Sequence, residues 1–159
     1  MASFMDILSS ESKQQFSSII NIGDILAAEL TPKEGVTPKE ENQESRYKYF
    51  VVVGKTEDGS AIGFLLINSK INSKLSQELK GLHYPLQKSK YDFLAYDSHV
   101  YCGEIKKIDV VNLVSKKNFK SFGRIEEEDL ELIKKAVISS PIVSKKELIR
   151  YGLVLQDAA

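Results

Sequence analysis

The chain has 159 residues, of which 42% are hydrophobic and 28% charged, and this composition is typical of one soluble globular domain with its own core. No apolar run approaches the roughly 18–20 residues that span a bilayer. The first ten residues lack the basic start and long apolar stretch of a signal peptide. We therefore expect a cytoplasmic protein without a membrane partner.

The charges cancel to a formal net charge of zero, but they are unevenly distributed along the chain. Residues 1–69 carry 6 basic and 10 acidic side chains, whereas residues 70–124 carry 11 basic and 5 acidic ones. A lysine-rich middle segment suits a phosphate-bearing partner, because phosphate contacts depend more on charge than on geometry. A solvated lysine-rich surface is the alternative interpretation.

The single cysteine, Cys102, cannot form an internal disulfide. It lies in a strand-like apolar stretch, which predicts a small buried residue rather than a reactive thiol. No cluster of cysteine and histidine has the spacing of a zinc site, so we expect no metal and no cofactor.

Apolar spacing predicts an N-terminal helix over residues 3–20, followed by a first strand over residues 25–30. Residues 31–45 contain two Thr-Pro-Lys-Glu units and almost no large apolar side chain, which predicts a mobile loop too polar for the core. Residues 47–55 and 61–69 are the densest apolar strands, and Asp58-Gly59 between them predicts a hairpin turn. Their nearly continuous apolar character indicates that both faces are covered.

The second half of the chain predicts a short helix over residues 71–82 and further strands over residues 83–87, 100–102 and 105–111. Pro85 places the strand over residues 83–87 at a sheet edge. No helix of crossover length separates these strands, which favours an antiparallel barrel.

Two helices follow. Leu130, Ile133 and Val137 share one face of the first, and the acidic run at residues 126–129 occupies its first turn, where the helix dipole favours anions. Ser144 and Glu147 form a capping box for a last short helix. We therefore predict a mainly β fold with α: a small SH3-like antiparallel β-barrel with an N-terminal helix and C-terminal helices.

The order of these elements resembles the PemK/MazF family of toxin ribonucleases, whose SH3-like barrel is related to that of the CcdB toxins. Four features carry the resemblance: Gly-Asp-Ile at residues 23–25, basic residues at 46–48 before a Val-rich strand, Ser69 at the end of the strand after the hairpin, and a late basic strand leading to a Leu-x-x-Ile helix. The resemblance implies a barrel domain over residues 22–138, with a helical extension at 1–21 and a helical tail at 139–159.

The resemblance also implies a chemistry. These toxins cleave single-stranded RNA without a metal, because the 2′-hydroxyl attacks the adjacent phosphate. Arg46 is the best match to the cation that stabilises the transition state, and Lys48 is its competitor. Ser69 matches the assisting hydroxyl, although Asn68-Ser69 replaces the more usual threonine-containing end. Further RNA contacts are expected from Lys70, Lys74, Lys88 and Lys90.

Several alternatives stay open at this point. His83 or His99 could act as a general base, or each could be a plain strand-edge or turn residue. The family also implies a protein antitoxin and a homodimer. The family usually has Arg-Pro immediately before the Val-rich strand, where this chain has Lys48-Tyr49. Because this position and the threonine position are altered, a non-catalytic binding module or CcdB-like protein inhibitor on the same barrel is the main alternative to an endoribonuclease. A scaffold whose terminal helices mediate oligomerisation is the third.

Overall fold

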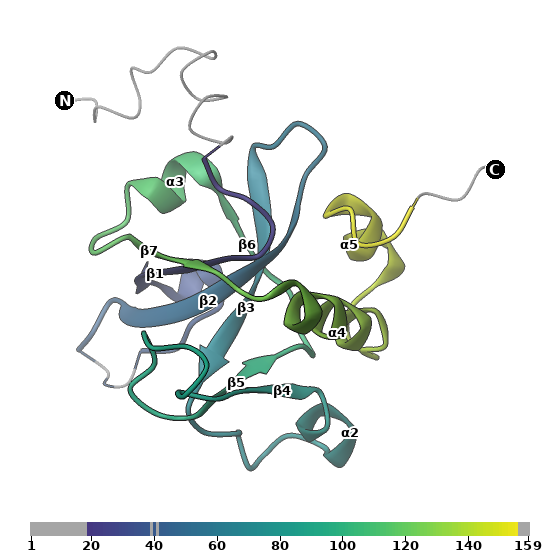
Figure 1. Ribbon diagram of the computed structural model, residues 1–159. Helices are drawn as coiled ribbons and strands as arrows, with labels where there is room; N and C mark the ends of the chain where they lie inside the picture. The colour runs from purple at the N-terminus through teal and green to yellow at the C-terminus, as the bar shows by residue number, and fades with distance from the viewer. Residues whose placement is uncertain (1–18, 39, 41, 156–159) are drawn as a thin grey trace.

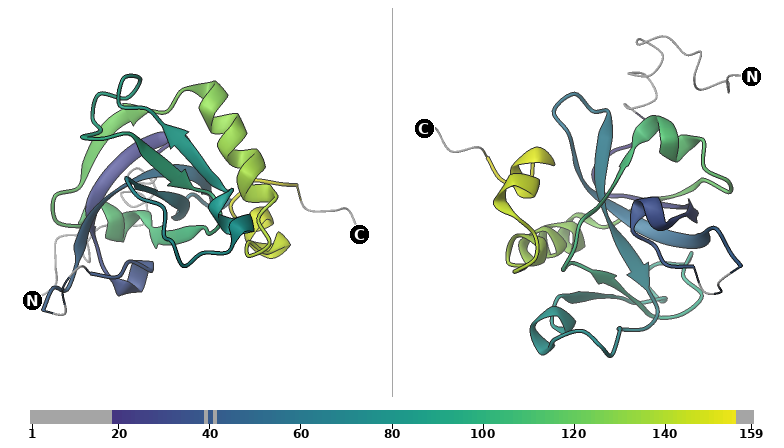
Figure 2. Two further views of the ribbon diagram at one scale, coloured as in Figure 1. Left: turned by 90° about the horizontal axis from the view of Figure 1, so that it is seen from below. Right: turned by 180° about the vertical axis from the view of Figure 1, so that it is seen from behind.

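A computed structural model of the protein describes residues 19–38, 40 and 42–155, and the N-terminal helix expected over residues 3–20 lies almost wholly outside them. Seven antiparallel strands form one sheet that curls into a half-barrel (Figures 1 and 2). The predicted fold class, mainly β with additional helices, is confirmed. The elements in chain order are β1 (Asp24–Leu30), the 3-10 helix η2 (Pro32–Glu34), β2 (Arg46–Lys55), β3 (Ala61–Asn68), α2 (Gln77–Lys80), β4 (His83–Leu86), β5 (Ser98–Tyr101), β6 (Lys106–Asp109), α3 (Val110–Val114), β7 (Lys120–Arg124), α4 (Glu127–Ile138) and α5 (Lys145–Arg150).

The strand order is β4-β5-β3-β2-β1-β7, and β6 pairs with the other half of β3. The long β2–β3 hairpin is the centre of the sheet, and its turn contains Gly59 at a positive φ of 73° as the Asp-Gly signal predicts. β4 and β7 are the two ends of the path among the described strands. Pro85 therefore lies in an edge strand, where its missing N–H costs no ladder hydrogen bond.

Both faces of the sheet are covered, as the continuous apolar strands predict. Val51 and Val53 of β2 belong to one buried cluster, and Phe50 and Val52 belong to the other. α4 and α5 lie against the first face, and α3 lies against the second (Figure 1). Within the described residues no helix combines the length and apolar character needed to cross a bilayer.

The C-terminal segment packs into the same core as the barrel. Tyr151, which follows α5, fills a slot over the paired Gly54 and Gly63 of the central hairpin. A Cβ atom on Gly54 would lie 2.3 Å from the Tyr151 carbonyl oxygen, so glycine is required by this close approach. The backbone N–H of Lys55 also donates to that carbonyl at 3.1 Å.

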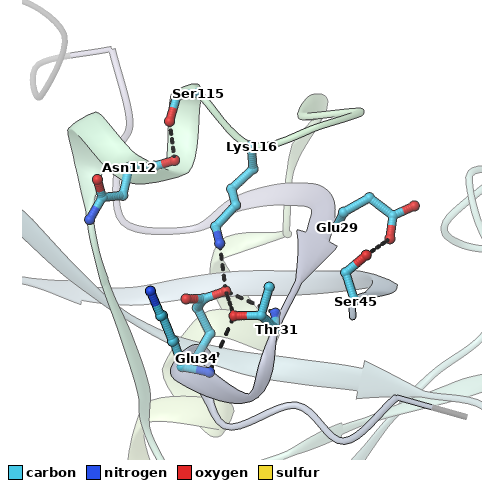
Figure 3. A network of polar contacts seen from close by, with 8 residues as sticks. Glu29, Thr31, Glu34, Ser45, Asn112, Ser115 and Lys116 are labelled. Carbon is cyan, nitrogen blue, oxygen red and sulfur yellow. Dashed lines mark hydrogen bonds and ion pairs between the residues drawn. The ribbon is translucent and has the colours of Figure 1, made fainter. Parts of the chain in front are cut away.

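Part of the segment predicted as a mobile polar loop is instead folded and buried. Thr31 and Glu34 form a capping box around η2, and the Glu34 carboxylate accepts from the Thr31 backbone N–H at 2.9 Å. Figure 3 shows Lys116 extending from the segment after α3 to the same carboxylate, at 2.8 Å. Val36 is buried in the second core cluster. The prediction that this loop is too polar for the core is therefore wrong for Glu34 and Val36, because a paired carboxylate can be buried.

Three other boundaries differ from the sequence prediction. The helix expected over residues 71–82 is a single turn, α2, with no buried residue. The strand expected over residues 105–111 ends at Asp109, because α3 begins at Val110 and its Val110 and Leu113 side chains are buried. β7 is absent from the prediction, since an exposed edge strand with one aromatic side chain has no apolar alternation.

Candidate functional site

An open groove of about 860 Å³ lies at the ends of β2 and β3 and beside the β4–β5 ribbon. We call it the β2–β3 groove. Its lining combines cations, aromatic rings and one strand-end hydroxyl: Arg46, Lys48, Lys70, Lys106, Tyr47, Tyr49, Tyr96, Tyr101, His83 and Ser69, with apolar side chains from the segments after β3 and α4.

The polar floor of the groove follows from strand alternation. On β2, the face that carries buried Phe50 also carries Lys48 and Arg46 two and four residues earlier. On β3, Asn68 lies on the same face beyond Leu66, which packs against that cluster. The buried core face thus becomes polar at one end of the strands, where the groove opens.

Lys48 is held in place by a cross-strand contact. It is only 8% exposed, and its Nζ atom donates a hydrogen bond to Oδ1 of Asn68. The contact forms because Tyr49 pairs with Ile67, so Lys48 and Asn68 are the next pair along the ladder. Asn68 is a site residue that the sequence prediction missed, although its register opposite Lys48 follows once the hairpin turn is placed.

The other two predicted catalytic residues line the same groove. Arg46 is the first residue of β2 and is half-buried, whereas Ser69 directly follows β3 and is exposed. Lys70, a predicted RNA contact, is exposed beside Ser69 and also lines the groove. The structure therefore places Arg46, Lys48, Ser69 and Lys70 in one groove, at the start of β2 and the end of β3.

Lys106 of β6 is a further cation of the groove. Its ammonium forms an ion pair with Glu104 at 2.9 Å, and both residues line the groove. The Lys106 side chain passes over Gly35, where a Cβ atom would lie 2.7 Å from Nζ. Gly35 has a positive φ of 82°, and this conformation favours glycine.

The two histidines lie on the neighbouring strands β4 and β5, with ring centroids 6.4 Å apart. His83 lines the groove, stacks on Tyr101 at 4.7 Å, and has Nδ1 2.9 Å from the carbonyl oxygen of Lys80. A carbonyl only accepts, so this contact places the hydrogen on Nδ1. His99 does not line the groove, and its Nδ1 is buried without a hydrogen-bond partner among the described residues.

The remaining predicted RNA contacts lie elsewhere. Lys74, Lys88 and Lys90 do not line the groove. Lys74 and Lys88 are exposed, and Lys90 forms ion pairs with Glu126 at 2.9 Å and with Asp129 at 2.8 Å. A role for these three lysines in binding RNA remains a prediction.

Asp129, the last residue of the acidic run at residues 126–129, makes tertiary contacts in addition to its interaction with the helix dipole. Its carboxylate accepts hydrogen bonds from Tyr84 Oη at 2.5 Å and from Tyr91 Oη, in addition to the Lys90 ion pair. Burial acts to raise the pKa of Asp129, but these three donors outweigh it and the pKa lies below its usual value. Burial, reinforced by Asp129, raises the pKa of Tyr84 and of Tyr91 to about 12.

Cys102 is a buried core residue, as predicted. It is fully buried, and burial raises the pKa of its thiol to about 12. A thiol with this pKa stays protonated at neutral pH, so it is not an activated nucleophile. In the part of the chain that the structure describes, no group of three or more His, Cys, Asp or Glu side chains is arranged to hold a metal ion.

The fold and the groove together define an antiparallel half-barrel with a cationic, aromatic-lined groove at one end of its central hairpin. No protein-family model matches the sequence, and no curated protein matches it. A search of solved structures finds similarity to a chain in the crystal structure of MazE–MazF (Form-III) from Deinococcus radiodurans, with a TM-score of 0.49 and 9% sequence identity. The match covers 76% of this chain and 94% of that chain.

Proposed function

We propose that this protein is a toxin-like, metal-independent endoribonuclease that binds single-stranded RNA in the β2–β3 groove. The observation that carries the proposal is the convergence of Arg46, Lys48, Ser69 and Lys70 on one groove that also contains aromatic rings. Cations that follow a phosphate backbone, combined with rings on which bases stack, are the usual elements of a single-strand binding site. The family resemblance supplies the reaction type.

In the proposed reaction the 2′-oxygen of one nucleotide attacks the adjacent phosphorus, and the bond from phosphorus to the 5′-oxygen breaks. The 2′-hydroxyl loses its proton, the departing 5′-oxygen gains one, and the products are a 2′,3′-cyclic phosphate and a 5′-hydroxyl. Negative charge increases on the phosphate oxygens in the transition state. Preorganised cations aimed at those oxygens would lower the barrier.

Lys48 and Asn68 form the preorganised part of this proposal. Asn68 holds the Lys48 ammonium at the floor of the groove, so little reorganisation is needed when a phosphate binds. Arg46 is the second cation, and its planar guanidinium suits two phosphate oxygens at once. The exposed Ser69 hydroxyl would hydrogen-bond the same phosphate.

The protein partner is also a proposal. A toxin of this kind would be neutralised by a protein antitoxin, and we propose that the antitoxin occupies the same groove. The apolar part of the lining supports a peptide ligand there, because Ile71 is 39% exposed and Ile142 is 51% exposed. A homodimer is proposed from the family resemblance alone.

The test is cleavage of single-stranded RNA by the purified protein in the presence of EDTA. We expect fragments that end in 2′,3′-cyclic phosphate, and loss of cleavage in Arg46→Ala, Lys48→Ala and Ser69→Ala. Lys146→Ala is the matched control, because Lys146 is an exposed lysine of α5 outside the groove. Intact RNA after incubation with and without divalent metal would remove the enzyme proposal.

A non-catalytic binding module is the second candidate. The low exposure of Lys48 and its hydrogen bond to Asn68 favour it, because both limit direct contact of the ammonium with a phosphate. Saturable RNA or protein binding without RNA cleavage would support this candidate and exclude the first.

A further inference from the structure

Tyr96 differs from the other six tyrosines of the chain. Each of those six has a ring contact or a hydroxyl hydrogen bond: Tyr47 with Tyr49, Tyr84 and Tyr91 with Asp129, Tyr101 with His83, and Tyr151 with Arg150. Tyr96 is 71% exposed, and its ring has no aromatic or cationic neighbour among the described residues. Its exposed ring is therefore not needed for packing.

The segment that carries Tyr96, residues 87–97, is firmly attached to the rest of the domain. Tyr91 and Leu94 are buried in the core, with 7% and 4% of their surfaces exposed. Asp97 accepts from the backbone N–H of Lys88 at 2.8 Å, which closes the segment on itself. Ser98 donates its hydroxyl hydrogen to the Tyr96 carbonyl at 2.9 Å.

Contacts with Asp129 and Glu126 attach the same segment to the start of α4. Tyr91 and Lys90, both in this segment, contact the Asp129 carboxylate at the start of α4. The backbone N–H of Glu126 also donates to Tyr91 Oη at 3.1 Å. The exposed position of the Tyr96 ring is thus imposed by a fixed backbone rather than by an unattached loop.

Tyr96 also lines the β2–β3 groove, together with Arg46 and Lys70. Neither of these cations has an ion-pair partner in the described part of the chain. A groove that presents cations and an unoccupied aromatic ring matches a polyanion with flat bases better than it matches an acidic peptide, which offers carboxylates but few flat rings.

We propose that Tyr96 is a nucleobase-stacking residue of the groove. It would stack on one base of a single-stranded RNA whose phosphates contact the groove cations. This inference rests on the proposed RNA-binding function and adds to it a base subsite outside the reacting residues. Because the backbone of residues 87–97 is already ordered, little conformational entropy is lost when a base stacks on the ring.

The experiment compares two ligands of equal charge. One is a single-stranded 2′-O-methyl oligoribonucleotide of about 12 nucleotides, within the usual range of single-strand sites. The other has the same backbone with abasic positions throughout. Neither can undergo attack by a 2′-hydroxyl, so the measured dissociation constants report binding alone.

We expect Tyr96→Ala to weaken binding of the base-bearing oligomer about tenfold, which is within the range for loss of one base–aromatic stack. Binding of the abasic oligomer should be unchanged. Tyr96→Phe should retain the wild-type affinity, because stacking needs the ring and not the hydroxyl. Leu132→Ala is the matched control, since Leu132 is an exposed apolar residue of α4 outside the groove.

Two results would overturn the inference while leaving the proposed function in place. One is wild-type affinity of Tyr96→Ala for the base-bearing oligomer, and the other is an equal loss for both oligomers. If the wild-type protein binds neither oligomer, RNA binding itself fails, and the inference fails with it. Unchanged melting temperatures of the Tyr96 variants will show that folding is intact.

Discussion

Two pairs of cations in this molecule lie in different surroundings: one pair stabilises the fold, and the other is the pair that we propose for binding a ligand. Lys90 and Lys116 each lie 2.8 Å from a buried carboxylate, Asp129 in the first case and Glu34 in the second. Arg46 and Lys70 line the β2–β3 groove without an ion-pair partner among the described residues. The proposed phosphate site therefore rests on the surroundings of these cations and not on the lysine content of a segment.

The two buried carboxylates also differ from each other. Glu34 is held mainly by its own turn, through the capping box with Thr31, and Lys116 adds one distant contact. Asp129 has donors 38 and 45 residues away, on the segment 87–97 and on β4. Loss of Asp129 should therefore affect a larger part of the fold than loss of Glu34.

The largest expected effect is that of Asp129→Ala. The change leaves two tyrosine hydroxyls without their acceptor and Lys90 without its buried partner, so we expect the free energy of unfolding to fall by about 2–3 kcal/mol. Urea denaturation measures it. Glu128→Ala is the control, because this exposed neighbour shares the helix turn without such contacts. If the two variants lowered the free energy of unfolding equally, residues 126–129 would stabilise the fold only through the helix dipole.

Glu34→Ala should have a smaller effect, about 1–2 kcal/mol, because it removes a capping box and one ion pair. The same denaturation measurement applies, with the exposed Glu40→Ala as its control. A loss as large as that of Asp129→Ala would contradict the contrast between local and distant partners.

Acid should weaken the contacts of both buried carboxylates, Asp129 and Glu34. The pKa values of Asp129 and Glu34 lie below their ordinary values of 3.8 and 4.5. Burial acts to raise the pKa of each carboxyl group. For Glu34, hydrogen bonds from Lys116 and Thr31 outweigh the effect of burial, as the three donors do for Asp129. A lowered folded-state pKa means that the unfolded state binds more protons, so the stabilisation is present above the ordinary pKa and is lost as pH falls through the folded one.

We therefore expect the free energy of unfolding of the wild type to decrease from about pH 5 to about pH 3. The decrease should be shallower in the double variant Asp129→Asn, Glu34→Gln. Identical pH profiles for the two proteins would mean that other carboxyl groups control acid stability.

The smallest effect on stability is expected in the groove. The double variant Arg46→Ala, Lys70→Ala should change the free energy of unfolding by less than about 0.5 kcal/mol for each substitution. Its binding to single-stranded RNA should become less salt-dependent, with the slope of log K against log salt reduced by about 0.7 for each lost phosphate contact. An unchanged slope would place the RNA, if it binds, away from the groove.

Much of the fold could be predicted from the sequence. β1, β2, β3, the Asp58-Gly59 turn, α4 and the capping box of α5 all follow from local apolar spacing and turn chemistry. β7 and α3 could not be predicted, because β7 is an exposed edge strand and Val110 and Val111 favour a strand by propensity. In α3 the burial of Val110 and Leu113 outweighs that preference.

The sequence by itself determined the strands of the central hairpin, since these depend on neighbours within a few positions. Arg46, Lys48 and Ser69 were proposed as site residues through the resemblance to the toxin family. Only the tertiary structure decided that Asn68 holds Lys48, that Lys90 pairs with Asp129, and that Tyr96 presents an unoccupied ring to the groove. These contacts join residues that are far apart in the chain, or depend on which face of a strand meets the groove. Sheet register and the packing of α4 determine them, and neither is encoded in any single local pattern.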